Sequence, residues 1–331
     1  MEEPVKQIVF ELTYRCNIRC NFCYNCWKAM DYPQDPELTA EQYDVLIPRL
    51  PRAEMYAMSG GEPLVRRDFA EVVTVIRGHC RYVSLITNGV NIDDALAARL
   101  AEWDVRVQLP VHGVGAGHDA ITGVPGNFKH LVDVFATLKE HGVPVATATV
   151  VSRENVDDLE RILEFAVAAG SRALLLIRFL PGGSGQGRWD MLPSREDVMR
   201  AYAVMDRVCG RYGVPGAVGV PNLPCVIDES AYKHVKFNFC GAGKNWFVVD
   251  PSGRLRICNH SPAIYGDLME RTVEEILEHP VLQDFAHDRV YPAECEGCEH
   301  LLECRGGCRA VAETMYDDLR GPDPLLRVEG R

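Results

Sequence analysis

Cysteine is the residue whose spacing most directly predicts chemistry in this chain. The sequence of 331 residues contains 13 cysteines, most of them in two groups. The N-terminal group is Cys16, Cys20, Cys23 and Cys26, and the C-terminal group is Cys240, Cys258, Cys295, Cys298, Cys304 and Cys308. Structural disulfides are uncommon in the reducing cytoplasm, where we expect this chain, so such crowding predicts metal centres. Cys80 and Cys209 fall within helical patterns and are expected in the core.

The first three cysteines form the pattern CxxxCxxC directly after a predicted strand. A four-iron cluster ordinarily takes four cysteines, so three thiolates leave one iron open for a ligand that is not protein. Alternatively, the loop holds a structural cluster or a zinc ion on Cys20, Cys23 and Cys26. The spacing by itself leaves both interpretations open.

Two motifs resemble those of the radical S-adenosylmethionine (SAM) superfamily. Phe22 gives the first motif the form CxxxCxΦC, in which Φ is aromatic. The second motif follows the second predicted strand and consists of Ser59, Gly60, Gly61, Glu62 and Pro63. Alone, SGGEP is usually a turn at the end of a strand, but its place one strand after CxxxCxxC makes coincidence improbable.

The resemblance implies a [4Fe-4S] cluster on the first three cysteines, with SAM chelating its open iron through amino and carboxylate groups. It further implies that Gly60, Gly61 and Glu62 receive the amino group. This agrees with the residue types, because paired glycines allow a ligand close to the backbone and a carboxylate suits an ammonium group.

Later strand ends are expected to border the same pocket. The residues assigned to it are Thr87, Asn88, Gln108, Thr149 and Arg178. Thr87 and Asn88 belong to a TNG motif that recurs in the superfamily, and the resemblance implies that Arg178 borders the methionine carboxylate or adenine of SAM. Thr149 lies on a strand where threonine alternates with alanine, so one face can present hydroxyl groups. The glycine-rich stretch after Arg178 lacks the GKS/T ending of a phosphate loop.

His112 is a candidate for a catalytic role. It lies in the segment QLPVHG, where many relatives end a strand in Ser and continue to Asp before the glycine; Pro110 and His112 stand at those places. We therefore expect His112 to be a replacement polar contact or a catalytic proton carrier. The structural alternative is a solvated loop histidine.

The C-terminal cysteines resemble the SPASM extension of radical SAM proteins, which is named for peptide and protein maturases. The pattern is C-x12-G-x4-C followed by CxxCxxxxxCxxxC. In that family, two auxiliary [4Fe-4S] clusters divide these ligands. Carried over, one cluster takes Cys240, Cys258 and Cys308 with an upstream ligand, and the other takes Cys295, Cys298 and Cys304 with a last cysteine.

Each auxiliary cluster then lacks one ligand. For the first cluster we expect Cys225, with His234 as the alternative. For the second, no cysteine follows Cys308 in this sequence, so Asp317, Asp318, Asp323 or water must serve, or the cluster is incomplete. We therefore expect one or two auxiliary clusters, with zinc on the last four cysteines as the alternative.

Short β-branched runs alternate with helical patterns as far as residue 212, which predicts a parallel sheet. The expected strands are residues 8–13, 53–58, 82–87, 105–109, 143–151 and 173–180. We predict an α/β fold, a partial (β/α)6 TIM-like barrel over residues 1–212, and a smaller cysteine-rich auxiliary-cluster domain over residues 213–331 with a hairpin at 246–258. The helix after Asn155 is expected to be capped by that residue.

The composition excludes some classes of function. The net charge of −12 and the lack of a compact Lys/Arg run argue against nucleic acid. No apolar stretch approaches the roughly 20 residues that span a bilayer, and no targeting segment is present, so we expect a cytoplasmic protein without a membrane partner.

The resemblance implies reductive cleavage of SAM to a 5′-deoxyadenosyl radical that abstracts hydrogen from a substrate. Most relatives with this extension modify ribosomally made peptides or protein side chains by cross-linking, epimerisation or oxidation. The alternatives are a small molecule such as a sugar, an aminocyclitol or a tetrapyrrole side chain, and, more remotely, a non-catalytic electron carrier. Expected partners are a flavodoxin or ferredoxin. Because Cys16 comes so early, a peptide substrate would need either a separate peptide-recognition protein or a pocket in the second domain.

Overall fold

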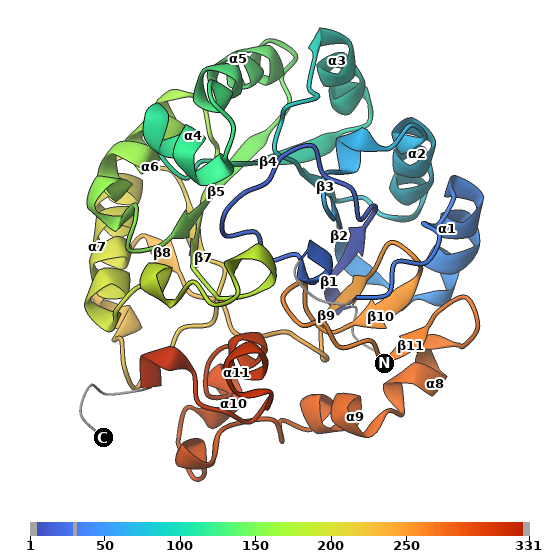
Figure 1. Cartoon of the computed structure of the whole chain (residues 1–331), viewed down its shortest axis with the longest axis vertical. Helices are drawn as coiled ribbons and strands as arrows, with labels where there is room; N and C mark the ends of the chain where they lie inside the picture. Colours follow the sequence, from blue (N-terminus) through green and yellow to red (C-terminus); the bar gives the residue numbers. More distant parts are fainter. Residues whose placement is uncertain (1–4, 29–31, 327–331) are drawn as a thin grey trace.

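The computed structural model describes residues 5–28 and 32–326, which are built around one curved sheet (Figure 1). The expected strands are all present as β1 (Val5–Glu11), β2 (Ala53–Ser59), β3 (Val83–Ile86), β4 (Val105–Pro110), β5 (Val145–Val151) and β6 (Leu174–Arg178). Each pairs in parallel with the next along the chain. The predicted α/β class and partial barrel are therefore confirmed, although the boundaries of these six strands differ.

Helices between these strands lie on the outside of the curved sheet (Figure 1). They are α1 (Ala40–Leu46), α2 (Phe69–His79), α3 (Asp94–Glu102), α4 (Ala116–Thr122), α5 (Asn127–Glu140), α6 (Leu159–Ala168) and α7 (Arg195–Tyr212). In α6 the buried side chains are Leu159, Ile162, Leu163 and Ala166, at the three- and four-residue spacing that predicts the helix. Because helices cover the outside of the sheet, the side chains of its strands are buried. The strands are therefore runs of apolar residues in the sequence.

The sheet continues beyond residue 212. The later strands are β7 (Gly216–Val218), β8 (Val235–Lys236), β9 (Trp246–Val249), β10 (Arg254–Arg256) and β11 (Gly266–Asp267). The expected hairpin is confirmed as β9 and β10, but β9 also pairs in parallel with β1. The strand order is therefore β11-β10-β9-β1-β2-β3-β4-β5-β6-β7-β8. The division at residues 212 and 213 stays a prediction, and its outer limits, 1–4 and 327–331, lie outside the described residues.

Short helices fill the cysteine-rich region, which lies along one side of the barrel (Figure 1). They are α8 (Val273–Leu277), α9 (Pro280–Ala286), α10 (Leu301–Cys304) and α11 (Arg309–Tyr316). Single 3-10 turns occur at η1 (Cys26–Lys28), η2 (Ile47–Arg49), η3 (Pro63–Val65), η4 (Val156–Asp158), η5 (Gly183–Gly185), η6 (Trp189–Met191), η7 (Glu229–Ala231), η8 (Ala293–Cys295) and η9 (Pro324–Leu326). Within the described part of the chain, no helix combines the length and apolar character needed to cross a membrane.

The carboxyl ends of β1 to β6 point to one end of the barrel, because the strands are parallel. CxxxCxxC, SGGEP, TNG and the glycine-rich stretch all leave strands at this end. In Figure 1 the dark-blue loop after β1 crosses the opening of the curved sheet. The fold therefore gathers the predicted motifs at the place where parallel strand–helix proteins build their sites.

Candidate active site and metal centres

The loop that carries the N-terminal cysteines is braced by SGGEP. The backbone N–H of Gly61 donates to Thr13 O at 2.8 Å, and that of Glu62 donates to Arg15 O at 2.9 Å. A Cβ atom on Gly61 would lie 2.2 Å from Arg15 O, and one on Gly60, whose φ is +126°, would lie 2.8 Å from Thr13 O. Both positions require glycine because one backbone passes directly against another. SGGEP is therefore more than a turn, since it sets the path of the cysteine loop.

Glu62 links SGGEP to the TNG motif. Its Oε1 accepts hydrogen bonds from Thr87 Oγ1 at 2.6 Å and Leu64 N at 3.1 Å, and its Oε2 accepts one from Asn88 N at 2.7 Å. Burial raises the pKa of Glu62, and these donors oppose the rise. The Asn88 side chain also donates to Asn17 Oδ1 in the cysteine loop at 2.7 Å. The two motifs predicted from sequence thus meet at that loop.

The glycine-rich stretch after β6 packs on the same loop from the other side. Ser184 N donates to Cys23 O at 2.7 Å. A Cβ on Gly183, whose φ is +50°, would lie 2.4 Å from Cys23 O and 2.6 Å from Asn25 O. Asn25 in turn donates through its side chain to Gly60 O at 2.8 Å. This stretch therefore has a structural role in holding the cysteine loop.

His112 supports the aromatic residue of the cysteine motif. The rings of Phe22 and His112 meet edge to face, with centroids 4.7 Å apart. The Nδ1 atom of His112 accepts from Val150 N at 3.2 Å, and its carbonyl accepts from the Asn155 side chain at 2.9 Å. Burial, followed by the effect of neighbouring His118, lowers the pKa of His112 to about 3. The solvated alternative is wrong, because His112 is 5% exposed; a catalytic proton transfer stays a prediction.

Asn155 does not cap α6, which corrects the prediction. The turn η4 comes between Asn155 and α6, and the Asn155 side chain makes no capping bond. Its Oδ1 instead accepts from Ser152 N at 2.9 Å. Asn155 also lines, with His112 and Glu154, a cavity of about 200 Å³ between the loops after β4 and β5. The side chain of Asn155 therefore stabilises the loops after β4 and β5.

Three other predicted SAM contacts have partners within the protein. The Thr149 hydroxyl donates to Val111 O at 2.8 Å. Gln108 is half-buried, and its carbonyl accepts from a backbone N–H of TNG at 3.3 Å. Arg178 forms a buried ion pair with Asp323. Contacts of these residues with SAM stay predictions, and the guanidinium of Arg178 is already bonded to the C-terminal segment.

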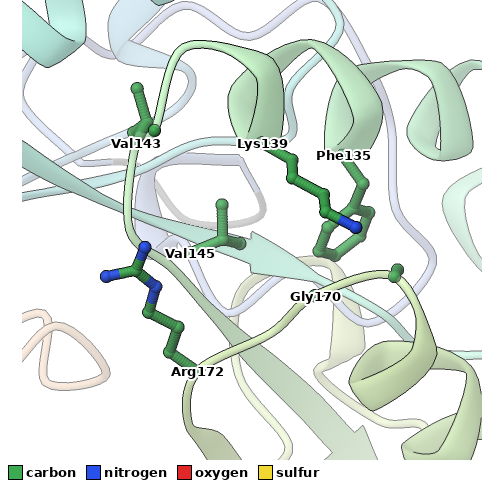
Figure 2. A pocket seen from close by; sticks show the side chains of 8 residues that line it. Phe135, Lys139, Val143, Val145, Gly170 and Arg172 are labelled. Atoms are coloured by element: carbon green, nitrogen blue, oxygen red, sulfur yellow. The ribbon is translucent and has the colours of Figure 1, made fainter.

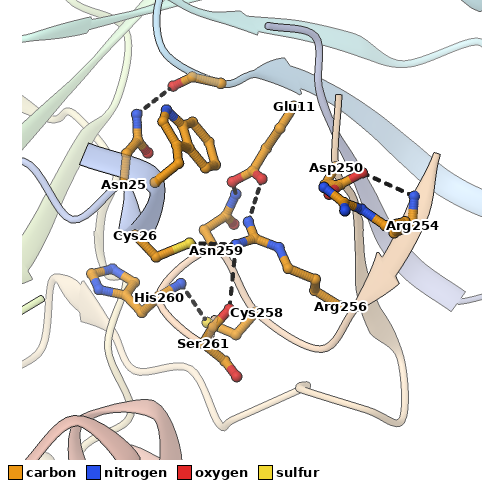
Figure 3. A network of polar contacts seen from close by, with 12 residues as sticks. Glu11, Asn25, Cys26, Asp250, Arg254, Arg256, Cys258, Asn259, His260 and Ser261 are labelled. Carbon is orange, nitrogen blue, oxygen red and sulfur yellow. Dashed lines mark hydrogen bonds and ion pairs between the residues drawn. The ribbon is translucent and has the colours of Figure 1, made fainter. Parts of the chain in front are cut away.

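Figure 3 shows a buried polar network that joins β1 to β10. Arg256 forms an ion pair with Glu11, and both side chains are 0% exposed. Asn259 donates to Glu11 Oε1 at 2.9 Å, and Arg256 Nη1 donates to Cys26 Sγ at 3.0 Å. Burial raises the pKa of Glu11 to about 7 against the opposing effect of Arg256. Cys26 thus belongs to this network, and the geometry does not favour it as a ligand beside the other cysteines of its loop.

An aromatic pair connects SGGEP with the C-terminal region. The rings of Tyr24 and His260 stack at 4.5 Å with an interplanar angle of 28°. The Tyr24 hydroxyl is hydrogen-bonded to Ser59, and His260 N donates to Cys258 Sγ at 3.5 Å. Burial, followed by the effect of nearby guanidinium groups, lowers the pKa of His260 to about 4. The stack therefore bridges the barrel and a cysteine of the auxiliary motif.

The C-terminal cysteines form two groups in space. The first, here named the proximal group, is Cys240, Cys258 and Cys308. Burial, together with the thiols of Cys308 and Cys240, raises the pKa of Cys258 to about 12. Cys308 and Cys258 also pack with Leu180 and Val220, which follow β6 and β7. The proximal group therefore lies against the active end of the barrel.

The second group, here named the distal group, is Cys295, Cys298 and Cys304. Burial, together with three neighbouring thiols, raises the pKa of the Cys295 thiol to about 11. These are Cys304, Cys225 and Cys298. Cys225 is therefore a neighbour of the distal group, whereas the family resemblance assigns an upstream cysteine to the proximal one.

The donor sets of both groups suit iron–sulfur clusters, because cysteine thiolates are the usual ligands of such clusters. Zinc on the C-terminal cysteines stays the alternative.

A smaller cavity lies at the opposite end of β5 (Figure 2). It measures about 50 Å³ and is lined by Phe135, Lys139, Gly142, Val143, Val145, Ala169, Gly170 and Arg172. Because β5 begins at Val145, this cavity is at the amino end of the strand and away from the cysteine loop. It has no part in the candidate site.

Comparison with known proteins agrees with this geometry. The model of the Radical SAM superfamily matches residues 10–166, and that of SPASM, an iron–sulfur cluster-binding domain, matches residues 240–299. Mycofactocin maturase MftC of Mycolicibacterium smegmatis is 32% identical, over 98% of this chain and 82% of its own length. The chain belongs to the radical SAM superfamily. It is therefore an enzyme, and its cofactors are SAM and iron–sulfur clusters.

Other relatives place this radical SAM enzyme among similar folds. PqqA peptide cyclase of Granulibacter bethesdensis is 27% identical, over 98% of this chain and 88% of its own length. The structure of anSMEcpe with bound AdoMet is 20% identical with a TM-score of 0.75, covering 97% of this chain and 93% of its own. Streptococcus suis SuiB bound to precursor peptide SuiA is 15% identical with a TM-score of 0.77, covering 98% and 76%.

The radical SAM motifs do not reveal the buried network around them. Glu11 is an acid within an apolar strand, and Arg256 is a base within the hairpin; each is a signal of a buried partner, but sequence cannot pair them. Tyr24 and His260 carry no local signal, because their contact joins two segments that are far apart in the sequence. Asp323 is predicted only as a substitute cluster ligand, and its partners in the structure are Arg178 and the backbone N–H of Cys308.

Proposed function

We propose that this radical SAM enzyme matures a ribosomally made peptide by abstracting hydrogen from one of its side chains. MftC is named a maturase and PqqA cyclase a peptide cyclase, and SuiB has been solved with a precursor peptide. The proposal rests mainly on one observation. The cysteine loop, the motifs that brace it and the proximal group come together at one end of the barrel. SGGEP and TNG brace the cysteine loop, and the Tyr24–His260 stack leads from it to the proximal group.

In this proposal Cys16, Cys20 and Cys23 hold the catalytic cluster. SAM bound at the open iron supplies the 5′-deoxyadenosyl radical. The Glu62 carboxylate, held in place by three donors, accepts a hydrogen bond from the amino group of SAM. Phe22, held against buried His112, shields one side of the loop from water.

The proximal and distal groups are proposed to hold auxiliary clusters. Such clusters pass or accept an electron, and the protein's task is to hold them in reach of the barrel and to keep water out. The contact of Cys308 and Cys258 with Leu180 and Val220 supports this placement for the proximal group. A flavodoxin or ferredoxin as electron donor, and a separate peptide-recognition protein, are part of the proposal.

Cleavage of SAM is the first test. Anaerobically reconstituted enzyme with dithionite is expected to form 5′-deoxyadenosine and methionine, and the Cys16→Ala/Cys20→Ala/Cys23→Ala variant to form neither. Glu62→Gln should raise KM for SAM by about tenfold or more, because an amide presents a donor where three donors already point. Glu54→Gln, at an exposed position, is the matched control. Cleavage by the triple variant would refute the assignment of the catalytic cluster.

The peptide is tested separately by mass spectrometry. A peptide encoded beside the gene is incubated with enzyme, SAM and reductant, and a change in mass confined to the peptide is expected. SAM cleavage without any peptide modification, combined with modification of a sugar or tetrapyrrole, would reject the peptide and retain the radical chemistry.

A further inference from the structure

Arg178 is the last residue of β6, and its side chain is buried at the carboxyl end of the barrel. Its guanidinium forms an ion pair with the carboxylate of Asp323, and both side chains are almost completely buried. A buried charge is costly unless a charge of opposite sign accompanies it. The pair therefore fixes Asp323 to the end of β6, across 145 residues of sequence.

The same carboxylate holds the backbone of Cys308. Asp323 Oδ2, which accepts from Arg178, also accepts from the N–H of Cys308 at 2.8 Å. A Cβ on Gly307, whose φ is +89°, would lie 2.5 Å from this oxygen, so the carboxylate can approach only because the residue is glycine. Asp323 thus connects the end of β6 to a cysteine of the proximal group.

The segment that carries Asp323 is fastened at further points. Arg309, the residue after Cys308, is buried and donates through Nη1 to Gly321 O at 2.8 Å. Asp323 Oδ1 accepts from the backbone N–H of Leu325 at 3.0 Å. The segment is therefore bonded to Cys308 and to its neighbour, and the carboxylate lies in the middle of this contact.

These contacts do not favour Asp323 as a cluster ligand. A carboxylate binds a metal through the lone pairs of its oxygens. Oδ2 already accepts two hydrogen bonds, one of them from a charged donor, and Oδ1 accepts a third. In the family this part of the chain brings the last cysteine ligand. In this protein it brings a carboxylate that is bonded to a guanidinium and to the backbone of Cys308.

We propose that Asp323 is a positioning residue of the proximal cluster, and that its buried pair with Arg178 sets the reduction potential of that cluster. This inference rests on the proposed assignment of Cys308 to the proximal cluster. The potential of an iron–sulfur cluster depends on nearby charge and on hydrogen bonds. In the wild type the two charges compensate each other. Loss of the carboxylate would leave the guanidinium unpaired in a buried site, where the effect of a charge is large.

The test requires a redox couple that belongs to the proximal cluster alone. The Cys16→Ala/Cys20→Ala/Cys23→Ala variant removes the catalytic cluster, so that an EPR-monitored redox titration follows the auxiliary clusters. The couple that disappears when Cys258→Ala is added belongs to the proximal cluster. If Cys258→Ala removes neither iron nor a couple, the inference fails, whereas SAM cleavage by protein with intact N-terminal cysteines would still support the proposed chemistry.

Asp323→Asn in this background tests the negative charge. The amide keeps an acceptor for the N–H of Cys308 but leaves the Arg178 charge unpaired, which favours the reduced, more negative cluster. The ratio of reduced to oxidised proximal cluster at a fixed potential should rise at least tenfold, which is about 59 mV for a one-electron couple. Asp157→Asn, in the exposed ion pair with Arg200, is the control and should leave this ratio unchanged.

Two results of Asp323→Asn would overturn the proposal. One is an unchanged potential of the proximal cluster. The other is loss of iron from the distal group while the proximal couple stays the same, because Asp323 would then be a ligand of the distal cluster.

The double variant Arg178→Gln/Asp323→Asn separates charge from structure. Because it removes both charges, no unpaired charge is buried and the protein should be more stable than Asp323→Asn. The potential of the proximal cluster should return most of the way to the wild-type value. A double variant that keeps the full shift of Asp323→Asn would show that the charge pair does not set the potential, and would overturn the proposal.

Discussion

The two cysteine-bearing regions of this enzyme are held in different ways. The N-terminal loop is fixed mainly by backbone against backbone, as where Gly61 and Gly183 press on carbonyl groups of the loop. The C-terminal region is fixed by buried charges, such as Arg178 with Asp323 and Arg256 with Glu11. A Cβ atom added at these glycines would therefore disrupt the N-terminal loop. Loss of one charged partner would disrupt the C-terminal region.

This difference follows from where the regions lie. Strand ends already converge at the mouth of a parallel barrel, so a loop there can be shaped by close contact alone. The C-terminal region joins the barrel partly through backbone pairing, because β9 pairs with β1. Charged side chains that reach the barrel, as Arg256 reaches Glu11, add to this connection.

The largest expected effect is loss of the Arg256 charge. Arg256→Met leaves Glu11 buried without its partner, which should lower the free energy of unfolding by about 3 to 5 kcal/mol. Chemical denaturation followed by tryptophan fluorescence measures it. Arg161→Met, at an exposed position, is the control and should change little.

The double variant Glu11→Gln/Arg256→Met sharpens this prediction. Removing both charges should recover part of the lost stability, because no unpaired charge is then buried. Equal destabilisation of the single and double variants would mean that packing, and not charge, joins the two regions.

A smaller but more selective effect is expected at Gly61. In Gly61→Ala the added Cβ would overlap Arg15 O, so the cysteine loop must shift and SAM cleavage should fall by at least about tenfold, or 1.4 kcal/mol of activation free energy. Iron in the auxiliary clusters should remain. Gly78→Ala, where a Cβ meets no atom within 4 Å, is the control. Loss of iron from the auxiliary clusters to the same extent as from the catalytic cluster would show that the two regions are not held in different ways.

The smallest effect is a pH dependence at His112. Its pKa is about 3 in the folded protein against an ordinary 6.5, so its contribution to stability is complete above pH 6.5 and is lost as the pH falls. Between pH 8 and pH 6 the free energy of unfolding should drop by about 1 kcal/mol more in the wild type than in His112→Gln. His287→Gln, at an exposed position, is the control and should show the same change of unfolding free energy with pH as the wild type. An equal change with pH in the wild type and in His112→Gln would show that His112 is not buried in its neutral form.

Much of the barrel is predictable from sequence because its signals are local. A β-branched run such as Val145–Val151 predicts its strand without knowledge of the neighbours. The very short β7 and β8 have no comparable signal, since a strand of two or three residues forms only when a longer neighbour offers hydrogen bonds. The side-chain bonds of Asn155 are unpredictable for the same reason, because their partner, the carbonyl of His112, comes from another loop.

The sequence by itself predicted which residues are candidates to bind metal and SAM. The spacing of Cys16, Cys20 and Cys23, and the types of residue in SGGEP, define ligands whose chemistry does not depend on distant parts of the chain. The tertiary structure alone decided which distant residues become neighbours, such as Glu11 with Arg256 across 245 residues and Arg178 with Asp323 across 145 residues. Spacing constrains contacts within a loop, whereas contacts between loops depend on how the strands and helices that carry them pack.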